Sequence, residues 1–399
     1  MEQSTREFAA ASSEVLDAKE YESSDAKSED RNDRYSAASS KRTSDADLLT
    51  ILNLAIELDL VSVDLETLGV ENGRDPRISE RSAYALGEGY SCTVCRHVMQ
   101  EGGPSSLPAG TTVALKKYRP NLPGPGESRR SNDAETYNTL RKEILVHSLL
   151  KEHENICKLL FLGWESGSPI PLLALELAAF GSLEYVLSSP GVGPSFLQKQ
   201  YLTVDIARGL DALHHCNICH VDLKPANILV QRQNDRVIAK ITDFGGAADP
   251  NSKPAVGTPL WSAPEVLVGG RSVDWVRADI YSFGLIIASL WLRPSYLGDA
   301  RATSSCYLDW TILEGLTGSL RSTALLLSKL KQDGDPGSVL AIALGQLGEQ
   351  GELDEQSTNA VRSLLRATLS TYGRRRKIMA EILQGELFHI IESVHPSNR

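Results

Sequence analysis

The chain has 399 residues, which allows one large two-lobed domain or two ordinary domains, and its 41% hydrophobic content is typical of a soluble globular protein. Its net charge of −10 excludes a broadly basic surface, so we expect no nucleic-acid binding and no binding to anionic membranes beyond a local basic patch. No run of about 18 apolar residues occurs, and we therefore expect no membrane span.

Residues 1–47 are predicted to be a disordered acidic tail. They contain 12 acidic and 7 basic side chains, many serines and few apolar groups. Such a segment buries too little apolar surface to offset the entropy that it would lose on ordering. The tail is interpreted either as an inert linker or as a phosphorylation target.

Residues 48–79 are predicted to be an extension that docks on the domain that follows. Apolar residues from Leu49 to Leu60 have helical spacing, with acidic residues near the start. The sequence over 58–65 partly alternates between apolar and polar residues, so a strand is the alternative there.

The stretch 84–99 is predicted to form two strands joined by a turn that contains Gly87 and Gly89. Two glycines at this spacing most often form an ordinary hairpin turn. They also allow backbone amides to close over a phosphate, because no Cβ stands in the way. Val94 follows on the second strand, where its side chain could lie over a purine.

The segment 113–118 is predicted to be a short apolar strand that carries Lys116. A buried lysine needs a partner, whereas on the alternative interpretation both lysines of the strand reach solvent. A loop around 120–132 leads to a predicted helix over 135–150. Glu143 on this helix is the acid expected to pair with Lys116.

Two strands are predicted next, around 156–164 and 172–177, followed by a glycine-bearing connector over 176–181. Leucines and an isoleucine at helical spacing between 202 and 213 then predict a helix. A strand-rich half followed by a helix-rich half indicates an α+β arrangement of two lobes with the ligand site in the cleft between them.

The stretch 220–227, HVDLKPAN, combines three chemically useful side chains in eight residues. Asp222 can accept the proton of an attacking hydroxyl, Lys224 can meet charge on a transferred phosphoryl group, and Asn227 can offer an amide oxygen to Mg²⁺. The alternative is that these residues only shape a turn around the proline.

Three further motifs follow this stretch. A strand over 237–244 ends in the DFG sequence at 243–245, GTPLWSAPE occupies 257–265, and an apolar helix runs from Asp279 through Leu292. The remainder to about residue 391 is predicted to be helical with loops. Its basic run, 374–377, is interpreted as an ion-pairing cluster in preference to a weak nuclear-localisation signal.

The six cysteines include two CxxC pairs, at positions 92 and 95 and at positions 216 and 219. This spacing leaves a four-cysteine zinc site or a redox pair to be considered. Free thiols in a reducing cytoplasm, with the nucleus as the alternative compartment, are the default expectation.

Taken together and in this order, the glycine turn, VALK, the helical glutamate, HVDLKPAN, DFG and APE resemble the protein kinase signature. The resemblance covers about residues 80–391. It implies the bilobal α+β protein kinase fold, with a small antiparallel N-lobe sheet and one key helix over 80–178, a mainly helical C-lobe over 179–391, and a C-terminal tail over 392–399. The two cysteine pairs would then lie in different lobes and could not share a metal.

The resemblance also implies a set of site residues. ATP would be bound by Leu86, Gly87, Gly89, Val94, Ala114, Lys116, Glu143, Glu176, Ala178 and Leu229, with Leu175 guarding the back pocket. Mg²⁺ would be held by Asn227 and Asp243, while Asp222 would be the base and Lys224 the cation at the transferring phosphate. Glu265 would pair with Arg376, and Asp279 would brace the backbone of the catalytic loop.

Lys224 together with Thr258 resembles the pattern of serine/threonine-specific kinases, so the expected reaction is ATP-dependent phosphorylation of a protein serine or threonine. A nucleotide-binding pseudokinase scaffold is the alternative, although pseudokinases usually lose one of the chemical residues that are intact here. A small-molecule kinase is disfavoured, because the 257–265 segment resembles a seat for a polypeptide substrate. The oligomeric state is left open.

Three positions depart from the family pattern: Cys92 replaces the third glycine of the loop, Val221 replaces an arginine, and His147 replaces an apolar residue. The missing arginine normally contacts a phosphate on the activation loop. We therefore expect basal activity without phosphorylation between Asp243 and Glu265. In lacking this arginine, the chain resembles kinases of the tyrosine-kinase-like branch.

Overall fold

The structure is a computed structural model. It describes residues 48–58, 60, 62–64, 85–88, 92–99, 107–118, 129–165, 168, 170–189, 193–234, 236–254, 257–268, 273–292, 344, 347 and 353–389. These residues form two compact units. The first unit contains the described residues up to Lys151 together with Cys157–Leu177, and the second contains Glu152–Ile156 and the described residues from Ala178 onward.

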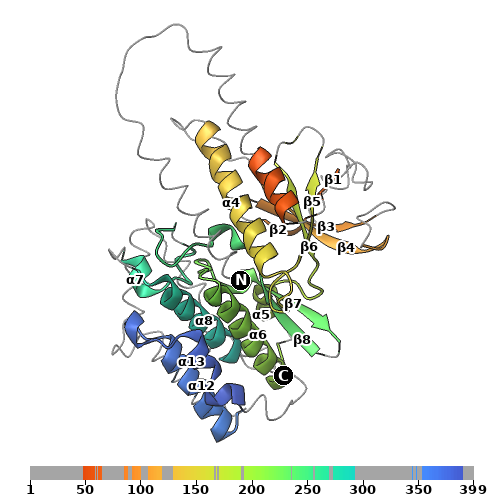
Figure 1. Cartoon of the computed structure of the whole chain (residues 1–399). Coiled ribbons are helices and arrows are strands. Elements are labelled where there is room, and N and C mark those ends of the chain that lie inside the picture. Colours follow the sequence, from red (N-terminus) through yellow and green to blue (C-terminus); the bar gives the residue numbers. More distant parts are fainter. Residues whose placement is uncertain are drawn as a thin grey trace, which may run out of the picture. The chain divides into compact units, whose positions relative to one another are not determined.

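The first unit is built on a six-stranded sheet (Figure 1). Its strands are β1 (Ser62–Asp64), β2 (Ala85–Glu88), β3 (Cys92–Val98), β4 (Thr112–Tyr118), β5 (Leu159–Trp164) and β6 (Leu172–Glu176), in the spatial order β1-β5-β6-β4-β3-β2. Strands β2 to β6 pair antiparallel, and β1 runs parallel to β5. The turn into β4 passes through Gly110, whose φ of 85° lies in the left-handed region that favours glycine.

One apolar cluster in this unit is formed by buried residues of the sheet. Its members come from β4, β5 and β6, together with Met99, the residue after β3: Met99, Val113, Leu115, Phe161, Leu172 and Ala174. Val113 and Leu115 are two residues apart on β4 and so share a face of the sheet. This period places Ala114 and Lys116 on the opposite face.

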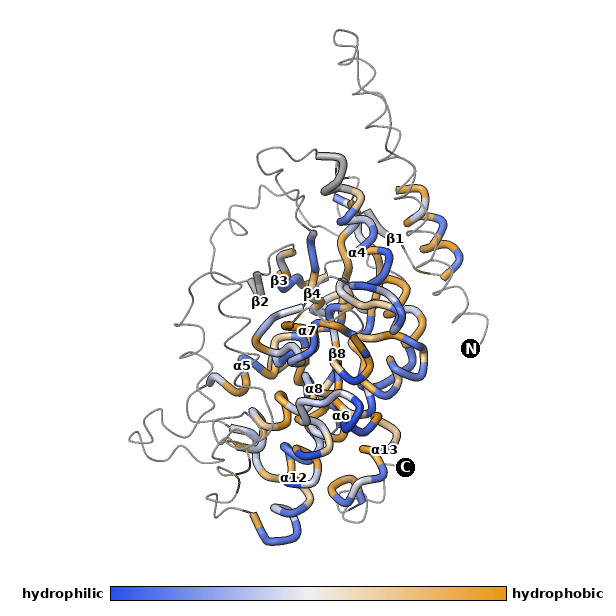
Figure 2. The backbone as a smooth tube through the Cα atoms, turned by 90° about the vertical axis from the view of Figure 1, so that its left-hand side faces the viewer, coloured by the Kyte–Doolittle hydropathy of each residue, from blue (hydrophilic) through white to orange (hydrophobic). Residues whose placement is uncertain are grey.

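The region over 48–65 contains both a helix and a strand, the two alternatives considered for it from the sequence. Residues 48–57 are helical, with Ile51 and Ala55 buried at 1% exposure each and Leu49 and Ile56 exposed, and Figure 2 shows both hydrophobic and hydrophilic residues along this helix. The strand alternative holds for β1, which pairs Ser62 with Leu162 and Asp64 with Trp164 of β5.

Helix α4 (Arg129–Leu149) supplies further core residues of the first unit. Leu140, Ile144 and Val146 are fully buried along it. The helix begins at Arg129, whereas a loop was predicted to Asn132. The first turn is polar, so the apolar period that marks the helix in the sequence starts only later.

The second unit is mainly helical, with a two-stranded sheet. Its elements are α5 (Leu183–Ser188), α6 (Phe196–His215), β7 (Ile228–Gln233), β8 (Arg236–Ile241), α7 (Pro264–Leu267), α8 (Trp275–Trp291), α12 (Glu355–Thr368) and α13 (Met379–Leu383), with 3-10 turns η1 (Pro225–Asn227), η2 (Phe244–Gly246) and η3 (Gly373–Arg375). A capping box between Ser195 and Gln198 begins α6. Its predicted apolar face is confirmed, because Leu202, Ile206, Leu210 and Leu213 are all buried.

The strand that precedes the DFG motif is shorter than predicted. Strand β8 ends at Ile241, because Asp243 adopts a left-handed backbone with φ of 66° and the next three residues form η2. A left-handed residue cannot continue a strand, and residue type alone did not indicate this break. With five antiparallel strands in the first unit and mainly helices in the second, the predicted α+β fold class is confirmed. None of the helices within the described ranges is both long and apolar enough to cross a membrane.

The close packing of α8 on α12 gives the first prediction. A Cβ added to Gly284 would lie 2.4 Å from Thr368 Oγ1 and 2.8 Å from Leu369 Cδ2. We therefore expect Gly284→Ala to lower the free energy of unfolding by about 1–3 kcal/mol, as overpacking of a core does. Ser289→Ala on the same helix serves as the control and should change stability by less than about 0.5 kcal/mol. Equal urea midpoints for the two variants would contradict this packing.

Candidate active site

Lys116 is buried in the first unit and paired with Glu143. Its side chain comes from β4 and is 5% exposed, and its Nζ lies 2.7 Å from Glu143 Oε1 and 2.8 Å from Oε2. Glu143 comes from α4 and is fully buried. The solvent-facing alternative therefore does not apply to Lys116, whereas Lys117, the next residue on the strand, is exposed and pairs with Glu165.

Two further side chains contact the Glu143 carboxylate, and we call the four residues the carboxylate cluster: Lys116, Tyr118, Glu143 and His147. The Tyr118 hydroxyl donates a hydrogen bond to Glu143 Oε2. His147 Nε2 lies 3.7 Å from Glu143 Oε1, and the aromatic ring of Tyr118 lies 5.3 Å from Lys116 Nζ. Tyr118 was not identified from the sequence, because a tyrosine at the end of a strand is unremarkable without its partner.

The cluster shifts the ionisation of Glu143. Burial alone would raise the pKa of this carboxyl, but the Lys116 ammonium and His147 outweigh burial and lower the pKa to about 2. The ionised form is therefore favoured in the folded protein. Because the folded pKa lies below the unfolded value of 4.5, the resulting stability is present above about pH 4.5 and is lost as the pH falls toward about 2.

This linkage predicts a pH-dependent effect of Glu143→Gln. Near neutral pH the free energy of unfolding of the variant should be about 3 kcal/mol lower than that of wild type, because the buried ammonium of Lys116 loses its charged partner. The difference should shrink as the pH falls below about 4.5, since only wild type loses stability through this group. Urea denaturation at several pH values measures the difference. Glu135→Gln, which makes the same change on an exposed side chain of α4, should show no such convergence.

The other predicted nucleotide contacts of the first unit lie along β2, β3, β4 and β6. Leu86 and Gly87 lie on β2, Val94 on β3, Ala114 on β4 and Glu176 at the end of β6; Gly89 lies outside the described residues. Val94 is directly opposite Lys116 across the β3–β4 pair. A Cβ added to Gly87 would meet no atom within 4 Å, so this glycine borders open space. Glu176 binds the backbone N–H of Lys158 through its carboxylate at 2.7 Å.

In the second unit, the backbone of segment 220–227 is hydrogen-bonded to the side chain of Asp279 on α8. Its carboxylate accepts the backbone N–H groups of His220 at 2.7 Å and Val221 at 2.9 Å. This double acceptance stabilises Val221 at a φ of 70°, a left-handed conformation that a β-branched residue rarely adopts. The Asp279 carboxylate thus supports a sparsely populated backbone conformation at the residue next to Asp222.

Asp222, Lys224 and Thr258 form a closed triangle of hydrogen bonds. Lys224 Nζ donates to Asp222 Oδ2 at 2.7 Å and to Thr258 Oγ1 at 2.8 Å, and the Thr258 backbone N–H donates to Asp222 Oδ1 at 2.6 Å. Burial would raise the pKa of Asp222, but the Lys224 ammonium and the hydrogen bonds from Lys224 and Thr258 lower it below its ordinary value. Asp222 is therefore an ionised acceptor at neutral pH.

The 257–265 segment approaches Asp222 so closely that only glycine fits at its first position. A Cβ on Gly257 would lie 2.5 Å from the Val221 carbonyl oxygen and 2.9 Å from Asp222 Oδ1. This segment begins in direct backbone contact with the candidate base. The sequence alone does not indicate this requirement, because the glycine at the first position of the motif shows no sign of the close approach to Asp222.

In the second unit, Asn227 is hydrogen-bonded to Asp222 and to Thr242, the residue that precedes Asp243. Asn227 Nδ2 donates to the Asp222 carbonyl at 2.9 Å, and the Thr242 N–H donates to the Asn227 carbonyl at 3.0 Å. The amide oxygen of Asn227 and the carboxylate oxygens of Asp243 fit Mg²⁺, which is commonly held by one or two such groups together with phosphates and water. Leu229, another predicted contact of the nucleotide, follows on β7, and Ala178 is the first residue of the unit after β6.

The cysteines within the described ranges give no indication of a thiol-bound metal. The five within the described ranges are free thiols, and among the described residues no three or more histidine, cysteine, aspartate or glutamate side chains are grouped to hold an ion. Burial, followed by the negative charge of Asp279, raises the pKa of Cys219, which is typical of an unreactive structural thiol.

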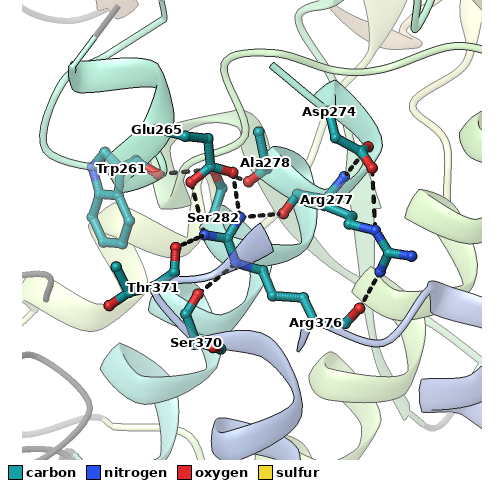
Figure 3. A network of polar contacts seen from close by, with 9 residues as sticks. All are labelled: Trp261, Glu265, Asp274, Arg277, Ala278, Ser282, Ser370, Thr371 and Arg376. Carbon is teal, nitrogen blue, oxygen red and sulfur yellow. Dashed lines mark hydrogen bonds and ion pairs between the residues drawn. The ribbon is translucent and has the colours of Figure 1, made fainter. Parts of the chain in front are cut away.

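The far end of the 257–265 segment is fastened by Arg376 (Figure 3). The guanidinium binds Glu265 through two bonds, Nη1 to Oε1 at 2.6 Å and Nη2 to Oε2 at 2.8 Å. It also donates to the backbone carbonyls of Ser370 at 2.7 Å and Arg277 at 2.9 Å. The Arg376 side chain is 0% exposed, while its neighbours Arg374, Arg375 and Lys377 are exposed. Within the basic run, Arg376 is the buried ion-pairing residue.

Residues 84–388 match the family described as protein kinase domain. Aligned relatives include the probable serine/threonine-protein kinase pats1 of Dictyostelium discoideum, 32% identical over 253 residues, which is 61% of this chain and 7% of that protein. The serine/threonine-protein kinase CTR1 of Arabidopsis thaliana is 34% identical over 166 residues, 39% of this chain and 19% of that protein. The human dual specificity testis-specific protein kinase 1 is 35% identical over 173 residues, 40% of this chain and 26% of that protein.

The chain therefore spans a small part of the length of these relatives, at most the 26% reached with the human protein. The family match, in contrast, covers well over half of the chain and includes both the carboxylate cluster and the 220–227 segment. The motifs identified in the sequence occur within it in the expected order. The chain is a member of the eukaryotic-type protein kinase superfamily.

Proposed function

We propose that this protein transfers the γ-phosphoryl group of ATP to the hydroxyl of a serine or threonine in a protein substrate. The observation that carries the proposal is the hydrogen-bonded triangle of Asp222, Lys224 and Thr258. It combines an ionised proton acceptor with a cation beside it, which is the pair of groups that in-line phosphoryl transfer requires.

Asp222 is the proposed base. Each of its carboxylate oxygens already accepts one hydrogen bond, from Thr258 N–H or from Lys224, and each keeps a second lone pair for the substrate hydroxyl. As the phosphorus–oxygen bond to ADP breaks and the bond to the substrate oxygen forms, the hydroxyl proton passes to Asp222. Lys224 then neutralises charge on the transferring group.

Lys116 is proposed to hold the α- and β-phosphates, with Glu143 fixing its ammonium. Val94, Ala114 and Leu229 are proposed to contact the adenine ring, Leu86, Gly87 and Gly89 to contact the phosphates, and the backbone from Glu176 to Ala178 to bind the adenine edge. Mg²⁺, held by Asn227 and Asp243, would screen the phosphate charge.

Serine/threonine specificity is supported by the direct contact between Lys224 and Thr258, because these are the two residues that resemble the serine/threonine pattern. The test is a phosphotransfer assay with labelled ATP, Mg²⁺ and mixed protein acceptors, followed by identification of the labelled amino acid. Phosphoserine and phosphothreonine are the expected products. Mainly phosphotyrosine would overturn the specificity, and nucleotide binding without any transfer would favour the scaffold alternative.

A further inference from the structure

We propose that Tyr118 is a positioning residue for nucleotide binding: its hydroxyl fixes the Glu143 carboxylate and, through it, the direction of the Lys116 ammonium. The inference deepens the proposed function, because it rests on Lys116 contacting a nucleotide phosphate. It does not depend on phosphoryl transfer, so the two proposals can fail separately.

The first argument is the place of Tyr118 in the sheet. Tyr118 and Lys116 are two residues apart on β4, so their side chains lie on the same face of the sheet. Strand β4 pairs with β3 along its whole length and with β6 over 113–116. Both side chains are 4% exposed. Lysine and tyrosine therefore extend into the same buried region from a backbone that the neighbouring strands hold in place.

The second argument is that both side chains bind one carboxylate. Lys116 Nζ lies 2.7 Å from Glu143 Oε1 and 2.8 Å from Oε2, and the Tyr118 hydroxyl donates to Oε2. Glu143 belongs to α4, whereas both of its partners belong to β4. The carboxylate is thus joined to the same strand at two points, and rotation of the carboxylate about its own axis would break at least one of these bonds.

The third argument is the difference in stiffness between the two partners. Lysine carries its ammonium on a flexible stem of four carbons, so by itself it would hold the carboxylate in several arrangements. The tyrosine hydroxyl sits on a rigid ring with two rotatable side-chain bonds. Its ring also lies 5.3 Å from Lys116 Nζ, within the range of a cation–π contact. Tyr118 is therefore the stiffer of the two connections from β4 to Glu143.

The consequence concerns the phosphate. An ammonium has three N–H donors, and the two carboxylate oxygens can accept two of them, so the position of the carboxylate sets the direction of the third. The Tyr118 hydroxyl also meets part of the negative charge of Glu143, which leaves more of the Lys116 charge for a phosphate in this poorly screened, buried place. Tyr118 should therefore strengthen the binding of ligands that carry phosphates and leave the binding of a nucleoside unchanged.

The test is calorimetric titration of the full chain with MgATP and with adenosine. Tyr118→Phe keeps the ring and removes only the hydroxyl. It should weaken MgATP binding by about ten-fold, the effect of losing a hydrogen bond to a charged group. Adenosine has no phosphate, so its affinity should change by less than about two-fold. Tyr372→Phe, which removes the hydroxyl of an exposed tyrosine in the second unit, should leave both affinities at their wild-type values.

A double-mutant cycle tests whether Tyr118 acts through Lys116. Lys116→Met should weaken MgATP binding, and adding Tyr118→Phe to it should change the affinity by less than about two-fold, because the group that Tyr118 positions is already gone. If the Lys116→Met proteins do not fold, the comparison of MgATP with adenosine in Tyr118→Phe decides alone.

Four results would overturn the proposal: wild type that binds no MgATP, a Tyr118→Phe protein with wild-type affinity for MgATP, equal weakening of MgATP and adenosine, and a full ten-fold effect of Tyr118→Phe in the Lys116→Met background. Equal weakening of the two ligands would indicate a general distortion of the fold. The expected affinities in a chain that transfers no phosphate would instead overturn the proposed function alone.

Discussion

Replacement of Asp222 with Asn is expected to lower kcat of phosphoryl transfer by about 10²- to 10⁴-fold, the typical contribution of a positioned base. The amide cannot accept the hydroxyl proton. It also removes the negative charge that Lys224 contacts at 2.7 Å. Asn is nearly the same size as Asp, so the segment should keep its fold and the KM for ATP should change little.

The measurement is steady-state phosphorylation of a protein substrate, with the melting temperature of each variant as a check on folding. Asp354→Asn is the matched control, because this exposed residue caps α12 with its side-chain oxygen and Asn caps helices equally well. Lys116→Met should also abolish activity, but through nucleotide binding. An Asp222→Asn protein that transfers phosphate at the wild-type rate would exclude Asp222 as the base.

Arg376→Met is expected to have the largest effect on stability. Removing one member of a buried ion pair typically costs about 3–5 kcal/mol, because its partner is left without compensation. Here Glu265 loses two hydrogen bonds and the carbonyls of Ser370 and Arg277 lose one each. The substitution also removes the cation–π contact between the Arg376 guanidinium and the Tyr281 ring, whose centroid lies 4.7 Å from the guanidinium carbon.

Arg374→Met provides a control two residues away, since that side chain is exposed and should contribute less than about 0.5 kcal/mol. Urea unfolding curves of both variants give the comparison. Glu265→Gln should lie between them, because the amide can still accept from the guanidinium. If the two arginine variants unfolded at the same urea concentration, the network of Figure 3 would not be a stabilising one.

The elements with a strong periodic signal could be predicted from the sequence, and so could the pairing of Lys116 with Glu143. Helix α6 has its apolar residues at regular helical spacing, and β4 is a short apolar run, so each pattern has one simple structural solution. The lysine inside a strand had to find an acid, because an unpaired buried ammonium is too costly. Their separation of 27 residues in the chain did not obscure this requirement.

The parts that could not be predicted depend on contacts between distant residues or on unusual backbone angles. Tyr118 gains its role only because α4 places Glu143 beside its hydroxyl. The left-handed conformation of Asp243, which ends the strand early, is set by its surroundings and not by its residue type. His147 was recognised as a departure from the family pattern, but its two oxygen partners emerge only in three dimensions.

The parallel strand β1 has a practical consequence for anyone who expresses this protein. The family match starts at residue 84, so a fragment cut at that limit would lack both β1 and the helix over 48–57. Strand β5 would then present a free row of backbone amides and carbonyls, the kind of border along which separate molecules add to one another's sheets and precipitate. A recombinant protein that keeps residue 48 onward avoids exposing that border.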